Sequence, residues 1–487
     1  MQETVLARKA TVVYSTLSAP WLMFAEAATF YIQAQQAEDI DQRRLYQGLT
    51  NAFAYHEDRR TTDALGGFCA TVLSIENTRR EWAFQKPIQL LTLLRRFRSR
   101  QATDHRDKVF SLLGLVDRWM TIPLKIDYKM TKDELYIFTT LNVVEETQSL
   151  SILCDIDQVA ERRPPLGGST FQEPCQLSWV PDWSKVLADD GLESERSSRY
   201  GHYSAGRTHG LAYIHDNRML ETQGYLVAKV TRIAPSVPQD AIERLRQTIL
   251  GWEEWWLQNT TRALGFERCG ITDEDRSIFA ETVCGNLLYN PKLGEILNAR
   301  QDPYTVSGRD EIERAYKAWT TDTTAQRNRK TAIMADLIAN SYKESEAVTQ
   351  LKNSFYYSVR SATVSRRFFT FCPIGSVSGL STNIGVGPPN LEVGDMIYIP
   401  DCSKVPLIIR PKASEQQRHS GFRARFIGKQ DSLHEKRRLI GPGDKTSERC
   451  DKQHALHEMI GDAYVNGFMD SESVSRGQPQ PATVYLV

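Results

Sequence analysis

The sequence lacks the marks of a secreted or membrane-spanning protein. Its eight cysteines are scattered singly, without a Cys-x-x-Cys pair, which is typical of reduced, buried thiols and argues against a disulfide scaffold. It has no apolar run of the roughly 18 residues that cross a bilayer, and no basic start followed by an apolar stretch and a cleavage site. We therefore expect a cytoplasmic protein without a membrane span.

An excess of charge of either sign is absent as well. Lys plus Arg and Asp plus Glu both number 60, so the formal net charge is zero and no overall field favours nucleic acid as a partner. The hydrophobic content of 41% and charged content of 25% are those of an ordinary globular protein. A chain of 487 residues is long enough to bury a core and to hold several domains.

The expected fold is mixed α+β, with mainly helical front and middle regions and a small antiparallel β module at the C-terminus. The predicted boundaries are 1–36, then 37–235 for a helical and mixed region, 236–360 for a helical region, and 361–487 for the β-rich module. A polar insertion at 412–452 interrupts this module and is predicted to be a mobile loop.

Helical spacing of apolar residues is clearest in the middle of the chain. It predicts helices over 241–256, 273–288, 309–319 and 330–352. Trp252, Trp255 and Trp256 fall on nearly one helix face, which is typical of helix packing rather than of a cofactor site.

Short β-branched or apolar runs predict strands elsewhere. They are expected at 11–14, 150–154, 219–234 as a pair around Gly224, 366–372, 395–400, 405–410, 455–468 and 483–487. The strand at 11–14 would be an unpaired edge, followed by a helix from Trp21. The segment 187–216, rich in Ser, Arg, Gly and His, is expected to be exposed.

The stretch 102–127 organises the front of the chain. The charged residues Asp104, Arg106 and Asp107 stand at the start of an apolar helical pattern that ends near Gly114. A second helix is expected to begin at Thr131. Capping and ion pairing at the helix start account for the charged residues; acid and base catalysis is the alternative interpretation.

Four ordered matches, spread over nearly the whole chain, resemble motifs of the heterokaryon incompatibility (HET) proteins of filamentous fungi. Near the start, Gln2, Glu3, Leu6 and Ala7, with Trp21 further on, resemble the end of the family's "W-x-x-QE-x-x-LA" element. DHRDKVFSLLGL is similar to "DPRDKVYALLGL", and LSWVPDWS to "LPSWVPDWS". The fourth match lies near the C-terminus, where VGD, VPLIIR and GDAYVNGFMD are similar to "GD-x-V … VPF-x-LR … GEAYVHGIMDGE". The residues that carry the resemblance, and that we predict to be structural or interaction residues, are Asp104, Arg106, Asp107, Lys108, Gly114, Trp179, Pro181, Asp182, Trp183, Gly394, Asp395, Gly461, Tyr464, Gly467 and Asp470.

The resemblance implies a function and also an incomplete domain. The family's upstream motifs have no counterpart here, so residues 1–36 resemble only the end of the HET domain. Characterised family members act in non-self recognition after cell fusion and trigger growth arrest or programmed cell death. The resemblance thus implies a non-enzymatic protein that signals through a protein partner, with no catalytic residue, cofactor or metal.

Two alternative functions stay open at the level of sequence. HET domains look distantly similar to TIR domains, some of which cleave NAD, and such an activity would depend mostly on the upstream part. The chain is alternatively an accessory protein of another pathway, such as a secondary-metabolite gene cluster.

Several weaker motifs suggest chemistry but have plainer interpretations. Gly385 and Gly387 form a GxG that is followed at once by two prolines, so a phosphate cradle is not expected. The resemblance to HET proteins implies a hairpin turn in this glycine-rich region. The segment 202–206 falls short of a serine hydrolase elbow. Cys450, His454, His457 and Glu458 lack a second ligand cluster, so they are not expected to bind metal.

A dense basic cluster lies beside the apolar stripe at 88–97 and extends just past its end. It consists of Arg95, Arg96, Arg98 and Arg100. We expect a solvated helix face whose side-chain stems cover apolar surface, with phosphate binding as the alternative.

Overall fold

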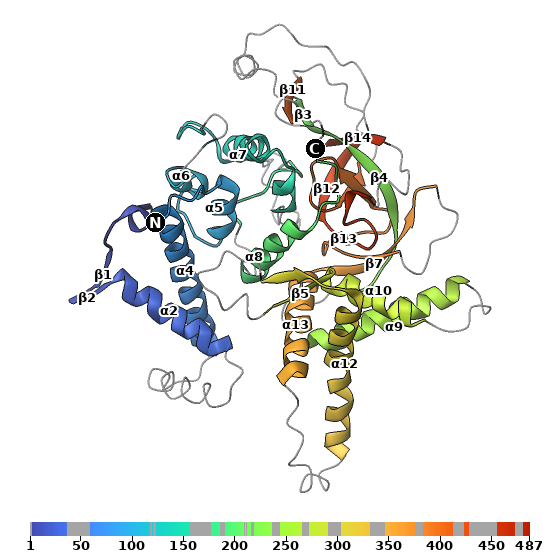
Figure 1. The fold of residues 1–487 in the computed structure, drawn as a ribbon. Helices are drawn as coiled ribbons and strands as arrows, with labels where there is room; N and C mark the ends of the chain where they lie inside the picture. Colours follow the sequence, from blue (N-terminus) through green and yellow to red (C-terminus); the bar gives the residue numbers. More distant parts are fainter. Residues whose placement is uncertain are drawn as a thin grey trace, which may run out of the picture. The chain divides into compact units, whose positions relative to one another are not determined.

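A computed structural model gives the fold in two compact units, Met1–Lys132 and Asp133–Val487, called here the N-terminal and C-terminal units (Figure 1). The fold is mixed α+β. The residues described are 2–36, 59–116, 119, 123–155, 177–185, 190–208, 210, 212–215, 219–235, 244–264, 272–290, 303–331, 346–375, 383–412, 423–427, 455–472 and 481–487. Within these residues, no helix is long and apolar enough to cross a membrane.

The N-terminal unit is mainly helical. Its elements are α1 (Gln2–Leu6), β1 (Thr11–Tyr14), β2 (Leu17–Pro20), α2 (Trp21–Gln36), α4 (Arg59–Ala83), α5 (Leu90–Arg96) and α6 (Asp107–Leu113). The strand predicted at 11–14 is present, but it is paired with β2 in an antiparallel hairpin rather than being an unpaired edge. Ser15 takes a positive φ of 54° in the two-residue turn, a conformation that suits tight hairpins.

A small core joins α2 to α4. Ala25 and Ala28 of α2 are buried against Cys69 and Val72 of α4. The indole of Trp21, at the start of α2, donates a hydrogen bond of 2.9 Å to the Glu76 carboxylate. Sequence reasoning missed α4, because its polar and glycine-containing sequence shows no clear apolar stripe.

A second core forms where α5 meets α6. Leu93, Val109 and Leu115 have no exposed surface, and Leu91, Leu94 and Phe110 are also buried. The apolar spacing that predicted both helices therefore reflects two packed faces. Gly114 ends α6 as predicted; a Cβ at this position would lie 2.7 Å from the Gln2 side chain.

The C-terminal unit combines helices with one large sheet. Its elements are α7 (Lys132–Thr147), η1 (Ser151–Asp155), α8 (Asp190–Arg199), η2 (Tyr200–His202), β3 (Ala212–His215), β4 (Met219–Ile233), α9 (Leu245–Leu264), α10 (Asp273–Cys284), β5 (Leu287–Tyr289), β6 (Tyr304–Val306), α12 (Arg309–Thr331), α13 (Glu346–Thr363), β7 (Arg367–Pro373), β8 (Ile384–Gly387), β9 (Met396–Pro400), β10 (Leu407–Pro411), β11 (Arg423–Ile427), β12 (Leu456–Asp462), β13 (Tyr464–Val465) and β14 (Pro481–Leu486).

The sheet is organised around β4 (Figure 1). This 15-residue strand pairs antiparallel with β3, β14, β9 and β7 along its length. The pairings of β4, β14, β12, β10 and β9 close into a ring, in which only β12 and β14 run parallel. The strands after residue 361 thus share their sheet with β3 and β4 instead of forming a sheet of their own.

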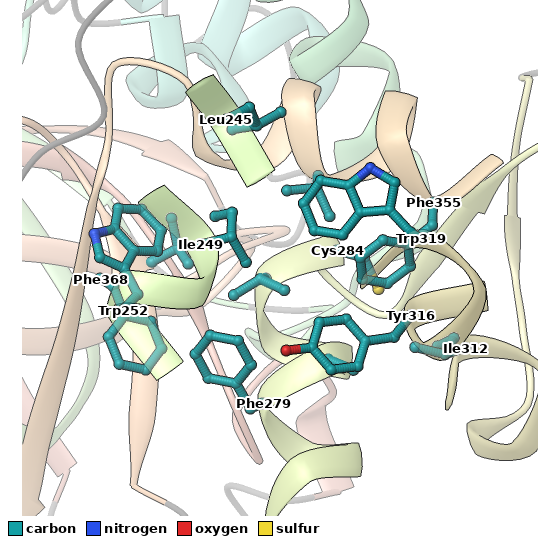
Figure 2. Close-up of a cluster of buried hydrophobic side chains, with 14 of the residues drawn as sticks. Leu245, Ile249, Trp252, Phe279, Cys284, Ile312, Tyr316, Trp319, Phe355 and Phe368 are labelled. Carbon is teal, nitrogen blue, oxygen red and sulfur yellow. The ribbon is translucent and has the colours of Figure 1, made fainter. Parts of the chain in front are cut away.

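Helices α9, α10, α12 and α13 share a core with β7 and β8. Its large side chains are aromatic: Trp256 and, labelled in Figure 2, Trp252, Phe279, Tyr316, Trp319, Phe355 and Phe368. The Trp256 and Phe279 rings stack with centroids 5.7 Å apart, and Phe368 reaches Phe279 from β7 at 5.4 Å. The tryptophan stripe of α9 is therefore part of the core, as predicted.

Several local predictions are wrong. Leu150 and residues 152–154 are buried, but 151–155 form a 3-10 helix rather than a strand. Within the insertion predicted to be a mobile loop, Arg423–Ile427 form strand β11, which pairs with β3. The helix predicted over 273–288 ends at Cys284, and strand β5 follows it. Residues 219–233 form one bent strand, because Gly224 lets the Ile399 carbonyl approach and the register shifts beyond it. Part of 187–216 is buried as α8 and η2. The GxG lies within strand β8, where the Phe369 ring occupies the space of the missing side chains.

Candidate functional site

The predicted site residues fall into four bonded groups. The group at 104–114 belongs to the N-terminal unit, and the groups at 179–183, 394–395 and 461–470 belong to the C-terminal unit. Each group ties together segments that are separate in sequence.

The first group is built around the Arg106 guanidinium. It donates to both oxygens of Asp104, with a shortest distance of 2.6 Å, and to the backbone carbonyls of Tyr128 (2.5 Å) and Met130 (3.0 Å). The Arg106 guanidinium lowers the pKa of the Asp104 carboxyl to about 2. Arg106 thereby fastens the segment that precedes α7 to the start of α6.

The next two motif residues extend this arrangement. The Tyr128 hydroxyl donates to Asp107 at 2.6 Å, and this hydrogen bond raises the pKa of Tyr128. The buried ammonium of Lys108 donates to the carbonyls of Arg98 (2.6 Å) and Arg100. The motif side chains therefore make structural bonds, and the predicted ion pairing is confirmed. Arg106 is the N-cap residue of α6 and its side chain makes no capping hydrogen bond; Asp104 instead accepts a hydrogen bond of 2.9 Å from the Arg106 backbone N–H.

The WVPDWS group lies at a turn. Trp179 and Trp183 are fully buried, and Pro181, which lies between them in the sequence, is buried as well. One oxygen of Asp182 accepts hydrogen bonds from the backbone N–H of Ser184 (3.0 Å) and from its hydroxyl. Asp182 thus stabilises the turn that carries both indoles into the core.

The same segment is bonded to strand β12 and to the residue that follows β14. The backbone N–H of Ser178 donates to the Val487 carbonyl at 3.1 Å, and the Ser178 hydroxyl accepts from the Met459 N–H at 2.9 Å. This links the WVPDWS motif to β12, the strand that leads into the GDAYV motif.

The third group pairs two motif elements directly. Arg410 donates to both oxygens of the buried Asp395, at 2.7 and 2.9 Å. Gly394 has a positive φ of 104°, which places its N–H 3.0 Å from the carbonyl of Val230 on β4. The "GD" and "LR" elements thus form a partly buried ion pair at the sheet, in which the Asp395 carboxylate is buried and the Arg410 side chain is 27% exposed.

The fourth group contains a buried ion pair with a tyrosine. Arg366 donates to both oxygens of Asp462, each at 2.7 Å, and the Tyr200 hydroxyl donates to the same carboxylate at 3.0 Å. Burial raises the pKa of Tyr200 well above its ordinary value. The pair joins the end of β12 to the junction between α13 and β7.

The remaining residues of this group shape the turn after β12. Gly461 and Gly467 have φ values of 150° and 79°, and Tyr464 packs edge-on against Tyr203 with centroids 5.9 Å apart. Asp470 forms a β-bridge with Ser204. Ser204 therefore belongs to a structural bridge, and a 3-10 helix, not a strand, precedes it, unlike in a hydrolase elbow.

Two buried arginines next to Tyr200 were not foreseen. Arg196 donates to the carbonyls of Ser361 (3.2 Å) and Val364 (2.9 Å), and Arg199 donates to those of Ser358 (3.2 Å) and Cys284. These carbonyls lie at the C-terminal ends of α13 and α10, where the helix dipole favours a cation. The only signal in the sequence was that both arginines share the face of Leu192.

Neither two buried cysteines nor the described metal-ligating side chains support a reactive site. Burial raises the pKa of Cys284 to about 12 and that of Cys402 to about 11, so both thiolates are strongly disfavoured at neutral pH. No group of three metal-ligating side chains occurs in the part of the chain that the structure describes. Cys450 and His454 lie outside the described residues, and burial lowers the pKa of His457.

Comparisons with protein-family models, with curated proteins and with solved structures found no match.

Proposed function

We propose that the chain is a cytoplasmic, HET-type fungal protein that acts in non-self recognition and incompatibility cell-death signalling, through protein interactions and without chemistry of its own. The observation that carries the proposal is that residues of the matched motifs are bonded to one another, or to residues next to a motif, across long stretches of sequence. Asp395 of the "GD" element pairs with Arg410 of the "LR" element, and Ser178 of WVPDWS bonds Met459 just before GDAYV. Such bonds support the interpretation that the motifs belong together as parts of one family's structure.

A second observation supports the interaction role. Helix α2 buries Ala25 and Ala28 against α4, while Leu22, Met23 and Phe30 on its opposite side are exposed. An exposed apolar helix face of this kind is typical of a protein that binds a partner.

The strands after residue 361, together with β3 and β4, are proposed to be the family's downstream β module. In this proposal the module still consists mainly of the C-terminal strands, as predicted, and β4 is included as its central strand.

Expression of the chain in a filamentous fungus tests the proposed function. We expect growth arrest or loss of viability with the wild-type chain and its loss with L22E/M23E, because two carboxylates on the exposed face of α2 oppose apolar binding. The control V306E places a carboxylate at another exposed apolar residue, 65% accessible, in the C-terminal unit and outside the motifs. Normal growth with the wild-type chain at detectable protein levels would reject the proposal.

An NAD-cleavage assay separates the proposed function from its enzymatic alternative. The purified chain is expected to convert no more NAD than a heat-killed sample. A clear rate above that sample would replace the signalling proposal with an NAD-cleaving one.

A further inference from the structure

The basic cluster at the end of α5 differs from the solvated face that the sequence predicted. Arg98 is buried, and Arg95, Arg96 and Arg100 are only partly exposed. Arg96 makes two hydrogen bonds to the Glu81 carboxylate, at 2.6 and 3.1 Å. The cluster is therefore partly buried in the N-terminal unit. Burying a charged guanidinium costs free energy unless an anion pairs with it.

Arg100 has no such partner within the described chain. Its Nη2 atom is shielded from solvent and makes no hydrogen bond. Burial lowers the pKa of Arg100, which shows that the charged guanidinium is disfavoured by its surroundings. The residue as a whole stays partly exposed, so a ligand can approach it from solvent.

Two further positively charged residues are near Arg100: Arg98, two residues earlier in the chain, and Lys108, which is hydrogen-bonded to the backbone of both arginines. The Lys108 ammonium donates to the backbone carbonyls of both Arg98 and Arg100, and Lys108 and Arg98 are themselves buried. Three positive side chains are thus attached to one short stretch of backbone. Positive charge gathered at low dielectric attracts anions more strongly than the same charge in water.

We propose that Arg100 anchors a binding site for the phosphate group of a small molecule, in the positive field of Arg98 and Lys108. A guanidinium offers a planar fork of N–H donors that matches a phosphate. A phosphate dianion balances more of the gathered charge than a single carboxylate. This site lies in the N-terminal unit and does not depend on the proposed signalling function.

Binding of inorganic phosphate to R100Q and to the wild-type chain tests the site. Calorimetric titration and thermal melts, at constant ionic strength, are expected to show phosphate binding and a raised Tm for the wild type. In R100Q we expect phosphate binding to weaken by roughly tenfold or more, since a charge-assisted fork is lost. The matched control R80Q removes an arginine that is exposed and paired with Glu76, and it should bind phosphate like the wild type.

The same variants make the idea easy to reject. Without phosphate, R100Q should melt at the same temperature as the wild type or higher, because an unpaired desolvated charge is removed. R100K, which keeps the charge but not the fork, should bind with intermediate affinity and serves if R100Q does not fold. The proposal would be overturned if R100Q or R100K bound phosphate as tightly as the wild type does. It would also be overturned if the wild type bound acetate as tightly as phosphate.

Discussion

The helical core of the C-terminal unit fully buries large aromatic side chains, whereas the contact between α2 and α4 fully buries two alanines, a cysteine and a valine and leaves its larger side chains, Trp21, Phe24, Tyr31 and Leu73, only partly buried. The ion pairs differ in the same way. The Arg366–Asp462 side chains are 8% and 11% exposed, and those of Arg106–Asp104 are 26% and 34% exposed. The C-terminal unit therefore stabilises itself by burial, while the N-terminal unit leaves both apolar and charged groups partly in contact with solvent.

The largest expected effect is in the aromatic core. Phe279 contacts the rings of Trp256, Tyr316 and Phe368, and none of its surface is exposed. Truncation to alanine should lower the free energy of unfolding by about 4 kcal/mol, since it removes buried surface and leaves a cavity. Urea denaturation measures this loss. A change below about 1 kcal/mol would mean that the core is far looser than the contacts indicate.

The buried ion pair should give the next largest effect. Asp462→Asn leaves the Arg366 guanidinium buried without a counter-charge, which should cost about 3 kcal/mol of unfolding free energy. The double variant R366M/D462L removes both charges and should recover part of that loss. Urea denaturation of the three proteins gives the comparison, and a double variant less stable than D462N would contradict the reasoning.

The small core of the N-terminal unit should respond less. Val72→Ala removes two buried methyl groups at the contact between α2 and α4, which should cost about 1 to 2 kcal/mol. Hydrogen exchange of α2 and α4 amides reads this change locally. The contrast between the two units would fail if this loss equalled that of Phe279→Ala.

The exposed ion pair should show its effect only in acid. The Arg106 guanidinium holds the folded-state pKa of Asp104 at about 2, below the ordinary value of 3.8. The stabilisation by this depressed pKa is fully present above pH 4 and is lost as the pH falls towards 2. Thermal melts between pH 5 and 2 should therefore fall less steeply for D104N than for the wild type. Parallel pH profiles would show that the pair has no influence on stability.

Sequence patterns predicted the helices whose apolar stripe is complete and missed those elements that only tertiary contacts define. The stripe of α9 ends in the stacked ring of Trp256, so spacing alone located it. Strand β8 is glycine-rich and exists because Phe369 of the neighbouring strand fills its surface. The ion pair of Arg366 and Asp462 joins residues 96 apart, a separation that no local pattern encodes.

Among the candidate site residues, sequence reasoning identified motif positions but not their partners. Asp395 was predicted from its motif, yet its pairing with Arg410 depends on the antiparallel register of β9 and β10. Arg196 and Arg199 were expected in solvent because their segment is rich in charged and small residues. Their burial follows from the helix C-terminal carbonyls that they bond, which become available only once α10 and α13 are packed.

The central position of β4 has a consequence for synthesis. Its N-terminal half pairs with β14, which leaves the ribosome roughly 250 residues, or some 10 to 50 s, after β4 at ordinary translation rates. Until then one edge of β4 exposes backbone N–H and C=O groups that can pair with other chains. A nascent or prematurely terminated chain that contains β4 but not β14 should therefore be far more prone to aggregate, or to require a chaperone, than the finished protein.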